Sequence, residues 1–212
     1  MDCHNEIAKR LSPSQSDISA KLSCTVRNSR ESDMAGFQRT YAFHVLHGLA
    51  SFGDQPPSVD ELNGRRADVL GRRLPYLVAE LDRDVLGYSY AARYRSRPAY
   101  RITAENSVYV DHRLAGRGVG GLLLSSLMGR CIEAGCHQMV VVGNSANTAP
   151  IALHRRTGFR HVGTLHSVGF KFGRWVDSVL MQRAVATGLP SGPTVALGAS
   201  DLAIPPAPSS SP

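Results

Sequence analysis

The chain has 212 residues, of which 42% are hydrophobic and 19% are charged. This balance predicts one globular domain with a sizeable core. The apolar runs are too short to cross a bilayer, and the first thirty residues lack the apolar stretch of a secretory signal. We therefore expect a cytoplasmic protein with no membrane partner.

The net charge of +7 belongs to the part that we expect to fold, because the segment after Ala184 carries one charged residue, Asp201. A basic surface attracts nucleic acid, an anionic cofactor or acidic substrates. The arginines are dispersed, and no basic run alternates with stacking aromatics as single-strand binders require, so we expect no nucleic-acid partner. The four cysteines are too scattered for a disulfide framework or a metal site.

Cap, turn and periodicity signals divide the chain into strands and helices. In chain order we expect a strand at 24–29, a helix from Ser32 or Asp33 to Leu49, a helix at 59–70, a hairpin at 76–94, a strand at 102–111, a helix at 118–135, a strand at 137–144, a helix at 151–158 opened by Pro150, and strands at 159–167 and 174–183. This order predicts an α/β chain with a mixed sheet. Residues 24–183 form the predicted domain, and the segments 1–23 and 184–212 have the composition of disordered ends.

A glycine-rich turn, GRGVGG at 116–121, lies between a predicted strand and a predicted helix. Glycines let the backbone approach an anion, and the free N–H groups of a helix N-terminus bind phosphate oxygens. The alternative is an ordinary tight turn. The pattern also satisfies the dinucleotide fingerprint, but the acidic residue that would hold the ribose is missing, and the Walker signature is absent. A phosphate site of this kind favours coenzyme A.

Three stretches together resemble the GNAT superfamily of acetyltransferases, and within it the phosphinothricin N-acetyltransferase group. They are TAENSVYVDHRLAGRGVG, NTAPIALHRRTGF and GFKFGRWVDSVLMQR, in the order that the family has them. The resemblance implies a GNAT fold, which is a mixed, strongly curved sheet flanked by helices with splayed fourth and fifth strands. It also implies acetyl-CoA as acetyl donor, no metal, and a homodimer.

The resemblance assigns residues to both ligands. The expected cofactor-binding residues are Val108, Tyr109, Val110, Gly116, Arg117, Gly118, Val119, Gly120, Gly121 and Asn147. The expected acceptor-binding residues are Arg95, Ser96, Arg97, Tyr100, Glu105, Asn106 and Ser107. One position departs from the family pattern, because Ala115 stands where Gln or Arg usually opens the phosphate loop. Backbone amides do most of the phosphate binding, so we expect weaker affinity at most.

Two residues are candidates for chemistry. Glu105 lies in the middle of its strand on the face opposite Ala104 and Val108, where it is either an exposed surface carboxylate or, by resemblance, the base that takes a proton from the acceptor ammonium. His154 is either a structural histidine or a donor to the leaving thiolate. The backbone N–H groups of Tyr109 and Val110 would contact the thioester oxygen.

The acceptor class follows from two arginines. If residues 95–97 are extended, Arg95 and Arg97 lie on one face, where guanidinium groups would suit the anionic end of an amino acid. The sequence thus predicts acetylation of a small anionic amino acid of the phosphinothricin, methionine sulfoximine or methionine sulfone type. The alternative for the two arginines is that they are surface residues without such a role. The alternatives for the function are a GNAT enzyme for another amine or a protein terminus, and a non-catalytic coenzyme A-binding module.

Overall fold

The computed structural model describes residues 24–49 and 51–186. The segments predicted to be disordered, 1–23 and most of 184–212, lie outside the described residues. The start of that tail was placed too early, because Ala184 ends a strand and the Val185 N–H donates to the His137 carbonyl. Within the described part of the chain, every helix is too short or too polar to cross a membrane.

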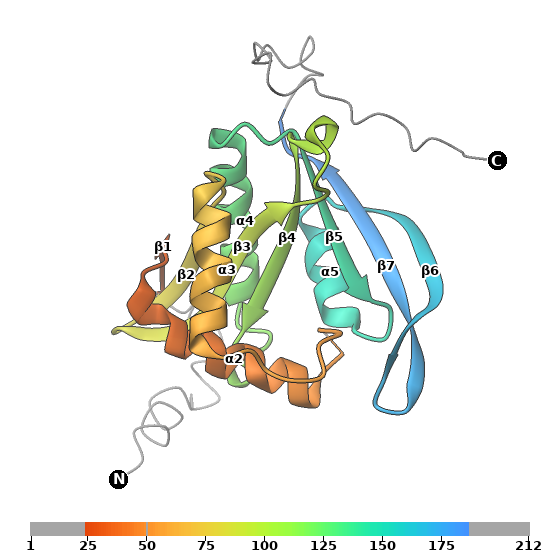
Figure 1. The fold of residues 1–212 in the computed structure, drawn as a ribbon, viewed down its shortest axis with the longest axis horizontal. Helices are drawn as coiled ribbons and strands as arrows, with labels where there is room; N and C mark the ends of the chain where they lie inside the picture. Colours follow the sequence, from red (N-terminus) through yellow and green to blue (C-terminus); the bar gives the residue numbers. More distant parts are fainter. Residues whose placement is uncertain (1–23, 50, 187–212) are drawn as a thin grey trace, which may run out of the picture.

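Within residues 24–49 and 51–186, the fold has seven strands and four α-helices (Figure 1). In chain order they are β1 (Thr25–Asn28), α2 (Met34–His47), α3 (Val59–Gly71), β2 (Tyr76–Leu81), β3 (Asp84–Arg93), β4 (Thr103–Val110), α4 (Val119–Glu133), β5 (Gln138–Asn144), α5 (Thr148–Arg156), β6 (Arg160–Lys171) and β7 (Arg174–Ala184). The connections of this described part also contain short 3-10 helices, η1 (Glu31–Asp33), η2 (Pro98–Tyr100) and η3 (His112–Leu114).

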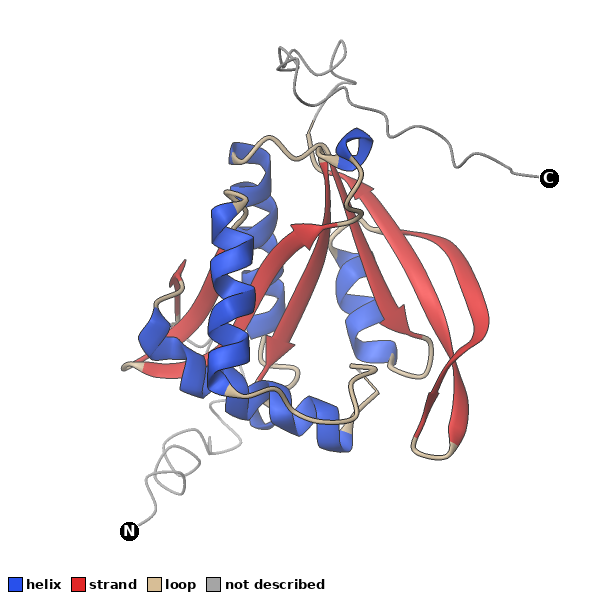
Figure 2. Ribbon diagram, viewed as in Figure 1, coloured by secondary structure: helices blue, strands red, loops and turns tan. Residues whose placement is uncertain are grey.

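The strands form one mixed sheet in the order β1-β2-β3-β4-β5-β7-β6 (Figure 2). The neighbours β4 and β5 are parallel, and the other pairs are antiparallel. The predicted order of elements and the mixed α/β class are confirmed. Helices α2 and α3 cover one face of the first strands, and α4 and α5 pack on the other face.

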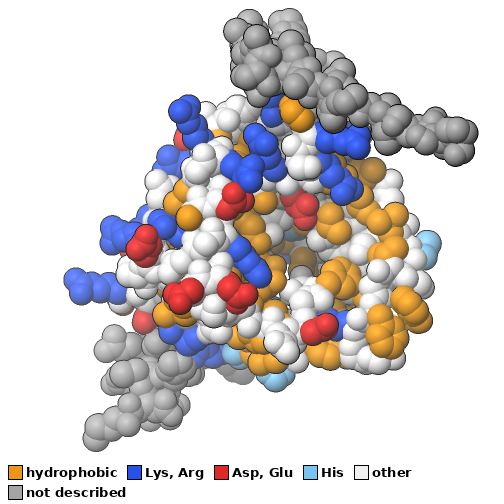
Figure 3. Space-filling view, viewed as in Figure 1, with side chains coloured by type: hydrophobic (Ala, Val, Ile, Leu, Met, Phe, Trp, Pro, Cys, Tyr) orange, Lys and Arg blue, Asp and Glu red, His pale blue; other side chains and the backbone are white. Residues whose placement is uncertain are grey.

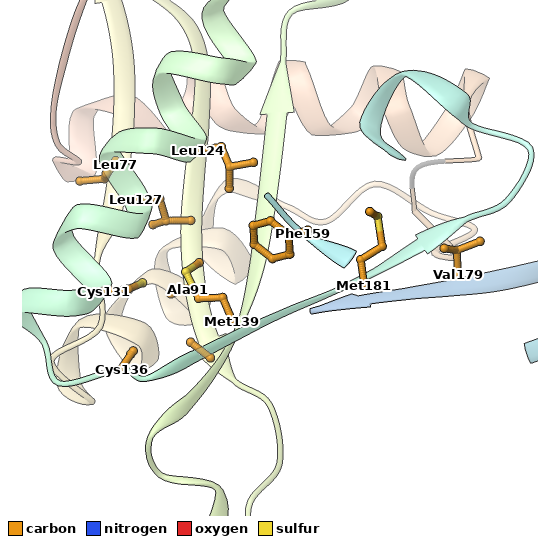
Figure 4. Close-up of a cluster of buried hydrophobic side chains, with 11 residues drawn as sticks. Leu77, Ala91, Leu124, Leu127, Cys131, Cys136, Met139, Phe159, Val179 and Met181 are labelled. Atoms are coloured by element: carbon orange, nitrogen blue, oxygen red, sulfur yellow. The ribbon is translucent and has the colours of Figure 1, made fainter. Parts of the chain in front are cut away.

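Two apolar layers hold these helices to the sheet. On one face, Phe37 of α2 stacks on Tyr88 of β3 with ring centroids 4.3 Å apart, among buried side chains of α3 and β2. On the other face, α4 packs its Leu124 and Leu127 against β3, β4 and β5 (Figure 4). Cys131 and Cys136 are buried in the same layer. The sheet is therefore fixed from both sides at the strands that carry the site.

The observed element ends differ from the predicted ones for local reasons. Helix α2 ends at His47, because Gly48 turns into the extended region, and Leu49 lies beyond it. Helix α5 begins at Thr148 and accommodates Pro150 in its first turn, where a missing N–H costs nothing. Helix α3 begins with a capping box, in which Ser58 and Glu61 bond each other's backbone N–H groups.

The sheet splits between β4 and β5. Three residues of each strand are paired, from Thr103↔Gln138 to Glu105↔Val140, and the pairing ends there. Beyond this point β4 stays paired with β3 as far as Val110, and β5 stays paired with β7 as far as Asn144. The two strands therefore diverge toward their C-terminal ends, as Figure 1 shows, and the predicted splaying is confirmed.

Candidate functional site

A cleft opens where β4 and β5 diverge. It has about 600 Å³ of empty space, part of which is open to solvent. Its walls are the C-terminal halves of β4 and β5, two residues of β7 and the first turns of α5. The lining includes Asn106, Ser107, Val108, Tyr109, Asn144, Asn147, Ile151 and His154. Figure 3 shows a hollow in the middle of this face, bordered by apolar side chains. The structure thus brings six of the predicted site residues into one cleft.

The glycine-rich turn lies at the N-terminus of α4. Gly116 and Gly118 have φ angles of 78° and 86°, and a Cβ at either position would meet open space. Glycine is used here because the backbone is left-handed. Gly118 caps α4, and Gly120 passes close to Leu153 of α5, where an added Cβ would lie 3.3 Å from its Cδ2. The first turn of α4 therefore offers an anion the N–H groups of Val119, Gly120 and Gly121, which no helix carbonyl accepts, and the positive end of the helix dipole.

Backbone N–H groups of β4 point into the cleft at every second residue. The Asp111 N–H donates to the Leu86 carbonyl, so odd-numbered residues of β4 direct their backbone groups toward β3. The Ile102 carbonyl accepts from Gln138 on the opposite side, which is consistent with this alternation. The N–H groups of Val108 and Val110 therefore face the gap, whereas the Tyr109 N–H belongs to the β3 ladder. The N–H groups of Tyr109 and Val110 were both expected from the sequence to contact the thioester oxygen. Of these two, only the Val110 N–H faces the cleft.

Glu105 lies on the other face of β4, toward the side of α2 and α3. It is half-buried, and this burial raises the pKa of its carboxyl group, while the charge of Arg95 opposes the shift. An exposed surface carboxylate would have an ordinary pKa, so the structure argues against that alternative. Ser107 follows on the same face and bonds the Tyr90 hydroxyl. A carboxylate with a raised pKa beside a cleft has the properties of a general base.

The segment with the two arginines is bent rather than extended. The chain bends at Tyr94, Ser96 and Arg97 after β3, and Tyr100 belongs to η2. Arg95, Ser96, Arg97 and Tyr100 are all exposed. Strand alternation therefore does not place Arg95 and Arg97 on one face, and that reason for pairing them was wrong. Arg95 lies over the Tyr94 ring, 4.9 Å from its centroid, and acts electrostatically on Glu105. Arg95 is thus the arginine of this segment that the structure brings near the carboxylate.

Asn106 and His154 contact each other on the cleft side of β4. Asn106 is 2% exposed and faces away from Glu105, since successive strand residues point to opposite faces. Asn106 and Ser107 both line the cleft, but the side chains of Asn106 and Glu105 lie on opposite faces of β4. His154 Nε2 lies 2.8 Å from Asn106 Oδ1, and its Nδ1 lies 2.8 Å from the Pro150 carbonyl oxygen. Burial lowers the pKa of His154, although the Pro150 carbonyl opposes this.

A buried lysine ties the loop between α2 and α3 to the β6–β7 hairpin. Lys171 Nζ donates to the carbonyls of Val45, 2.8 Å away, and Ser51, 2.6 Å away. The Ser51 hydroxyl contacts the Tyr41 hydroxyl, and the Tyr41 ring meets the edge of Tyr109, which lines the cleft. Lys171 belongs to the third family motif, GFKFGRWVDSVLMQR, but its contacts with Val45 and Ser51 were not predicted from the sequence. The loop is therefore held beside the face that carries Glu105.

Comparison with known proteins decides the family. The model of the acetyltransferase (GNAT) domain matches residues 26–180. The chain belongs to the GNAT family of acetyltransferases. It is 49% identical to a phosphinothricin N-acetyltransferase of Alcaligenes faecalis, over 80% of this chain and 86% of the relative. It is 37% identical to an L-methionine sulfoximine/L-methionine sulfone acetyltransferase of Salmonella typhimurium, over 74% of this chain and 92% of that protein.

Solved structures agree with this assignment. A GNAT superfamily phosphinothricin acetyltransferase from Sinorhizobium meliloti, in complex with acetyl-CoA, superposes with a TM-score of 0.79 at 38% identity, covering 83% of this chain and 96% of the other. A putative acetyltransferase from Salmonella typhimurium with its cofactor acetyl-CoA gives 0.76 at 34% identity, covering 78% and 96%. The predicted family, enzyme class and acetyl donor are thus confirmed.

One residue of the GNAT cleft was not found by sequence reasoning. Asn144, at the end of β5, is 3% exposed, and its Oδ1 accepts the Ala146 N–H at 2.8 Å. Its Nδ2 has no hydrogen-bond partner within the part of the chain that the structure describes. An unsatisfied buried donor costs about 1–3 kcal/mol, so a bound molecule with an acceptor at this point would recover that free energy. The cleft therefore fits a ligand with amide carbonyls, such as the pantetheine of acetyl-CoA.

The turn before α4 generates a prediction about this cofactor. Replacing Gly118 with Asp or with Asn tests the anion site, because both residues tolerate the left-handed backbone and have the same shape. We expect Gly118→Asp to raise the KM for acetyl-CoA at least about tenfold more than Gly118→Asn, since the carboxylate repels phosphate. Steady-state kinetics with varied acetyl-CoA measures this. Equal KM values for the two variants would place the phosphates elsewhere.

Proposed function

We propose that this enzyme transfers the acetyl group of acetyl-CoA to the amino group of a small anionic amino acid of the phosphinothricin, methionine sulfoximine or methionine sulfone type. The arrangement around β4 carries the proposal. This strand presents the N–H groups of Val108 and Val110 to the cleft on its open edge, and the half-buried Glu105 lies on its α2/α3 face. The names of the similar curated proteins support the substrate class.

The cofactor would be held along a path from α4 to the split in the sheet. The turn 116–121 would bind the pyrophosphate, β4 and Asn147 would contact the pantetheine, and Asn144 Nδ2 would donate to one of its amide carbonyls. Two other residues of this turn are assigned to the cofactor: Arg117, which precedes the N-cap Gly118, and Val119, which is the first residue of α4. Acetyl-CoA supplies the acetyl group as a thioester.

Proton transfer falls to Glu105. An ammonium group has no lone pair for attack, so a base must take its proton, either directly or through a water molecule. Burial raises the pKa of Glu105, so its ionised carboxylate is a stronger base than an ordinary carboxylate. The Val110 N–H, directed into the cleft, would stabilise negative charge on the carbonyl oxygen. The amine attacks the thioester carbonyl directly, without an acyl-enzyme; the C–N bond forms, the C–S bond breaks and coenzyme A leaves as its thiolate.

The anionic end of the acceptor would bind the segment that follows β3. Arg95, Arg97 and Tyr100 are exposed there, and Arg95 acts on the Glu105 charge. A guanidinium group binds a carboxylate or phosphinate with strong, directional hydrogen bonds. Ser96 and Ser107, which the family resemblance assigns to the acceptor, would add hydroxyl groups. This assignment supports an amino acid with an anionic group rather than a cationic amine.

The homodimer and the cytoplasmic location remain predictions. The β6–β7 hairpin exposes a continuous apolar surface, which suits a protein partner better than water. Its exposed side chains are Val162, Leu165, Val168, Phe170, Phe172 and Trp175. Figure 3 shows hydrophobic side chains gathered over this side of the molecule. A mass of one chain, measured by light scattering of the purified protein, would contradict the dimer.

The role of Glu105 is tested by an isosteric change. We expect Glu105→Gln to lower kcat by roughly 10²–10⁴, the usual contribution of a general base, and to leave acetyl-CoA affinity nearly unchanged. In the wild type, kcat/KM should fall as the pH drops through the pKa of Glu105, which burial places above its ordinary value. This acid limb should vanish in the variant. A loss of less than about tenfold would assign the base to another group.

The acceptor site is tested by removing one guanidinium group. We expect Arg97→Ala to raise the KM for methionine sulfone by about tenfold or more and to change the KM for acetyl-CoA by less than about twofold, because the lost contact is to the acceptor's anion. Arg130→Ala is a matched control, since this exposed arginine lies at the far end of α4 and pairs with Glu133. Equal acceptor KM values in the two variants would remove Arg97 from the site.

A further inference from the structure

The C-terminal end of α2 connects the two halves of the split sheet. One half consists of β1 to β4 and the other of β5 to β7, and they pair through three residues of β4 and three of β5. In the first half, His44 Nε2 of α2 lies 2.9 Å from the carbonyl oxygen of Val110, the last residue of β4. In the second half, Lys171 Nζ of β6 donates to the Val45 carbonyl of α2. A chain of contacts therefore runs from β4 through α2 to β6, at the end of the sheet where the strands diverge (Figure 1).

Lys171 caps the C-terminus of α2. The Val45 carbonyl lies in the last turn of this helix, where the helix itself supplies no N–H partner. A cation at this position also meets the negative end of the helix dipole. The same ammonium group donates to the Ser51 carbonyl of the α2–α3 loop, and Lys171 is 4% exposed. An apolar side chain in its place would leave both carbonyls without this donor.

A second contact holds the same loop to β6. Gly169 lies two residues before Lys171 in this strand, so the two residues face the same side. A Cβ on Gly169 would lie 2.5 Å from Cε1 of Phe52, so the Phe52 ring rests directly on the glycine backbone. Gly169 does not have a left-handed backbone, so this contact rather than the conformation requires a glycine here.

The contacts of the loop continue to the wall of the cleft. The Ser51 hydroxyl lies 2.8 Å from the Tyr41 hydroxyl, and the Tyr41 ring meets the edge of Tyr109 with centroids 4.9 Å apart. Tyr109 lines the cleft, and its side chain lies on the same face of β4 as that of Glu105. A displacement of Ser51 would therefore reach the face on which the proposed base lies.

We propose that Lys171 is a positioning residue for the acceptor. By binding the carbonyls of Val45 and Ser51, it holds the α2–α3 loop beside the Glu105 face and fixes the two halves of the sheet relative to each other there. Gly169 supports this position because it leaves room for the Phe52 ring. The inference rests on the proposed function in so far as the acceptor binds on the Glu105 face.

Chymotrypsin cleavage after Phe52 tests these contacts in the full-length enzyme without cofactor or acceptor. We expect Lys171→Met to raise the cleavage rate by about tenfold or more, because the loop loses its charged anchor. Arg174→Ala is the matched control, since this exposed residue lies opposite Lys171 in the same hairpin, and it should change the rate by less than about twofold. Mass spectrometry of the fragments gives the rate at this bond. Equal rates in the wild type and Lys171→Met would overturn the inference.

Two glycine variants test the same position independently, and they decide the matter if Lys171→Met does not fold. Gly169→Ala forces Phe52 away from β6, whereas Gly163→Ala, in the same strand, adds a Cβ that meets open space. We expect Gly169→Ala to raise the rate of cleavage after Phe52 by about fivefold or more and Gly163→Ala to change it by less than about twofold. Equal rates in these two variants would overturn the inference.

Steady-state kinetics separates a positioning role from a role in stability alone. The acceptor is whichever of phosphinothricin, methionine sulfone and a polyamine the wild type uses with the highest kcat/KM. We expect Lys171→Met and Gly169→Ala to raise the KM for this acceptor by about tenfold or more and to change the KM for acetyl-CoA by less than about twofold. A lower melting temperature with an unchanged acceptor KM would overturn the inference. A preference for the polyamine would contradict the proposed function alone, because the two KM values would still decide the role of Lys171.

Discussion

The separation of β4 from β5 after three paired residues is the constraint on which the site depends. Each strand is held on its outer side, β4 by β3 and β5 by β7, so neither can move to close the gap. An open edge inside a sheet leaves backbone donors without partners, and such groups bind ligands that carry acceptors. The turn before α4 follows β4 in the chain, so the proposed anion site lies close to the end of the open edge.

The alternation of side chains along β4 divides the chemistry between its two faces. Glu105 and Ser107 face the side of α2 and α3, where the loop held by Lys171 and the exposed arginine segment border the same region. Asn106 faces the cleft and His154. A single strand thus carries Glu105, the proposed base, on one face and Asn106, which lines the cleft, on the other. Moving the register of β4 by one residue would exchange these roles.

Much of the fold was predictable because its signals are local. Caps, glycines and apolar periodicity indicated nearly every strand and helix, and the three family motifs indicated the split sheet and the acetyl donor. The contacts within the site were less predictable because their partners are far apart in sequence. Asn106 and His154 are 48 positions apart, and Lys171 reaches Ser51 across 120. The bends at Tyr94, Ser96 and Arg97 were not predicted, and the pairing of Arg95 with Arg97 depended on an extended segment after β3.

The central claim is that this GNAT enzyme acetylates the amino group of a small anionic amino acid. A thiol-release assay with acetyl-CoA tests it most directly, using phosphinothricin and methionine sulfone beside the amide of methionine sulfone and a polyamine of similar size. The account predicts that kcat/KM for the two anionic amino acids exceeds that for the amide and the polyamine by about tenfold or more. Faster acetylation of the polyamine, or thiol release that is independent of every amino acid, would contradict it.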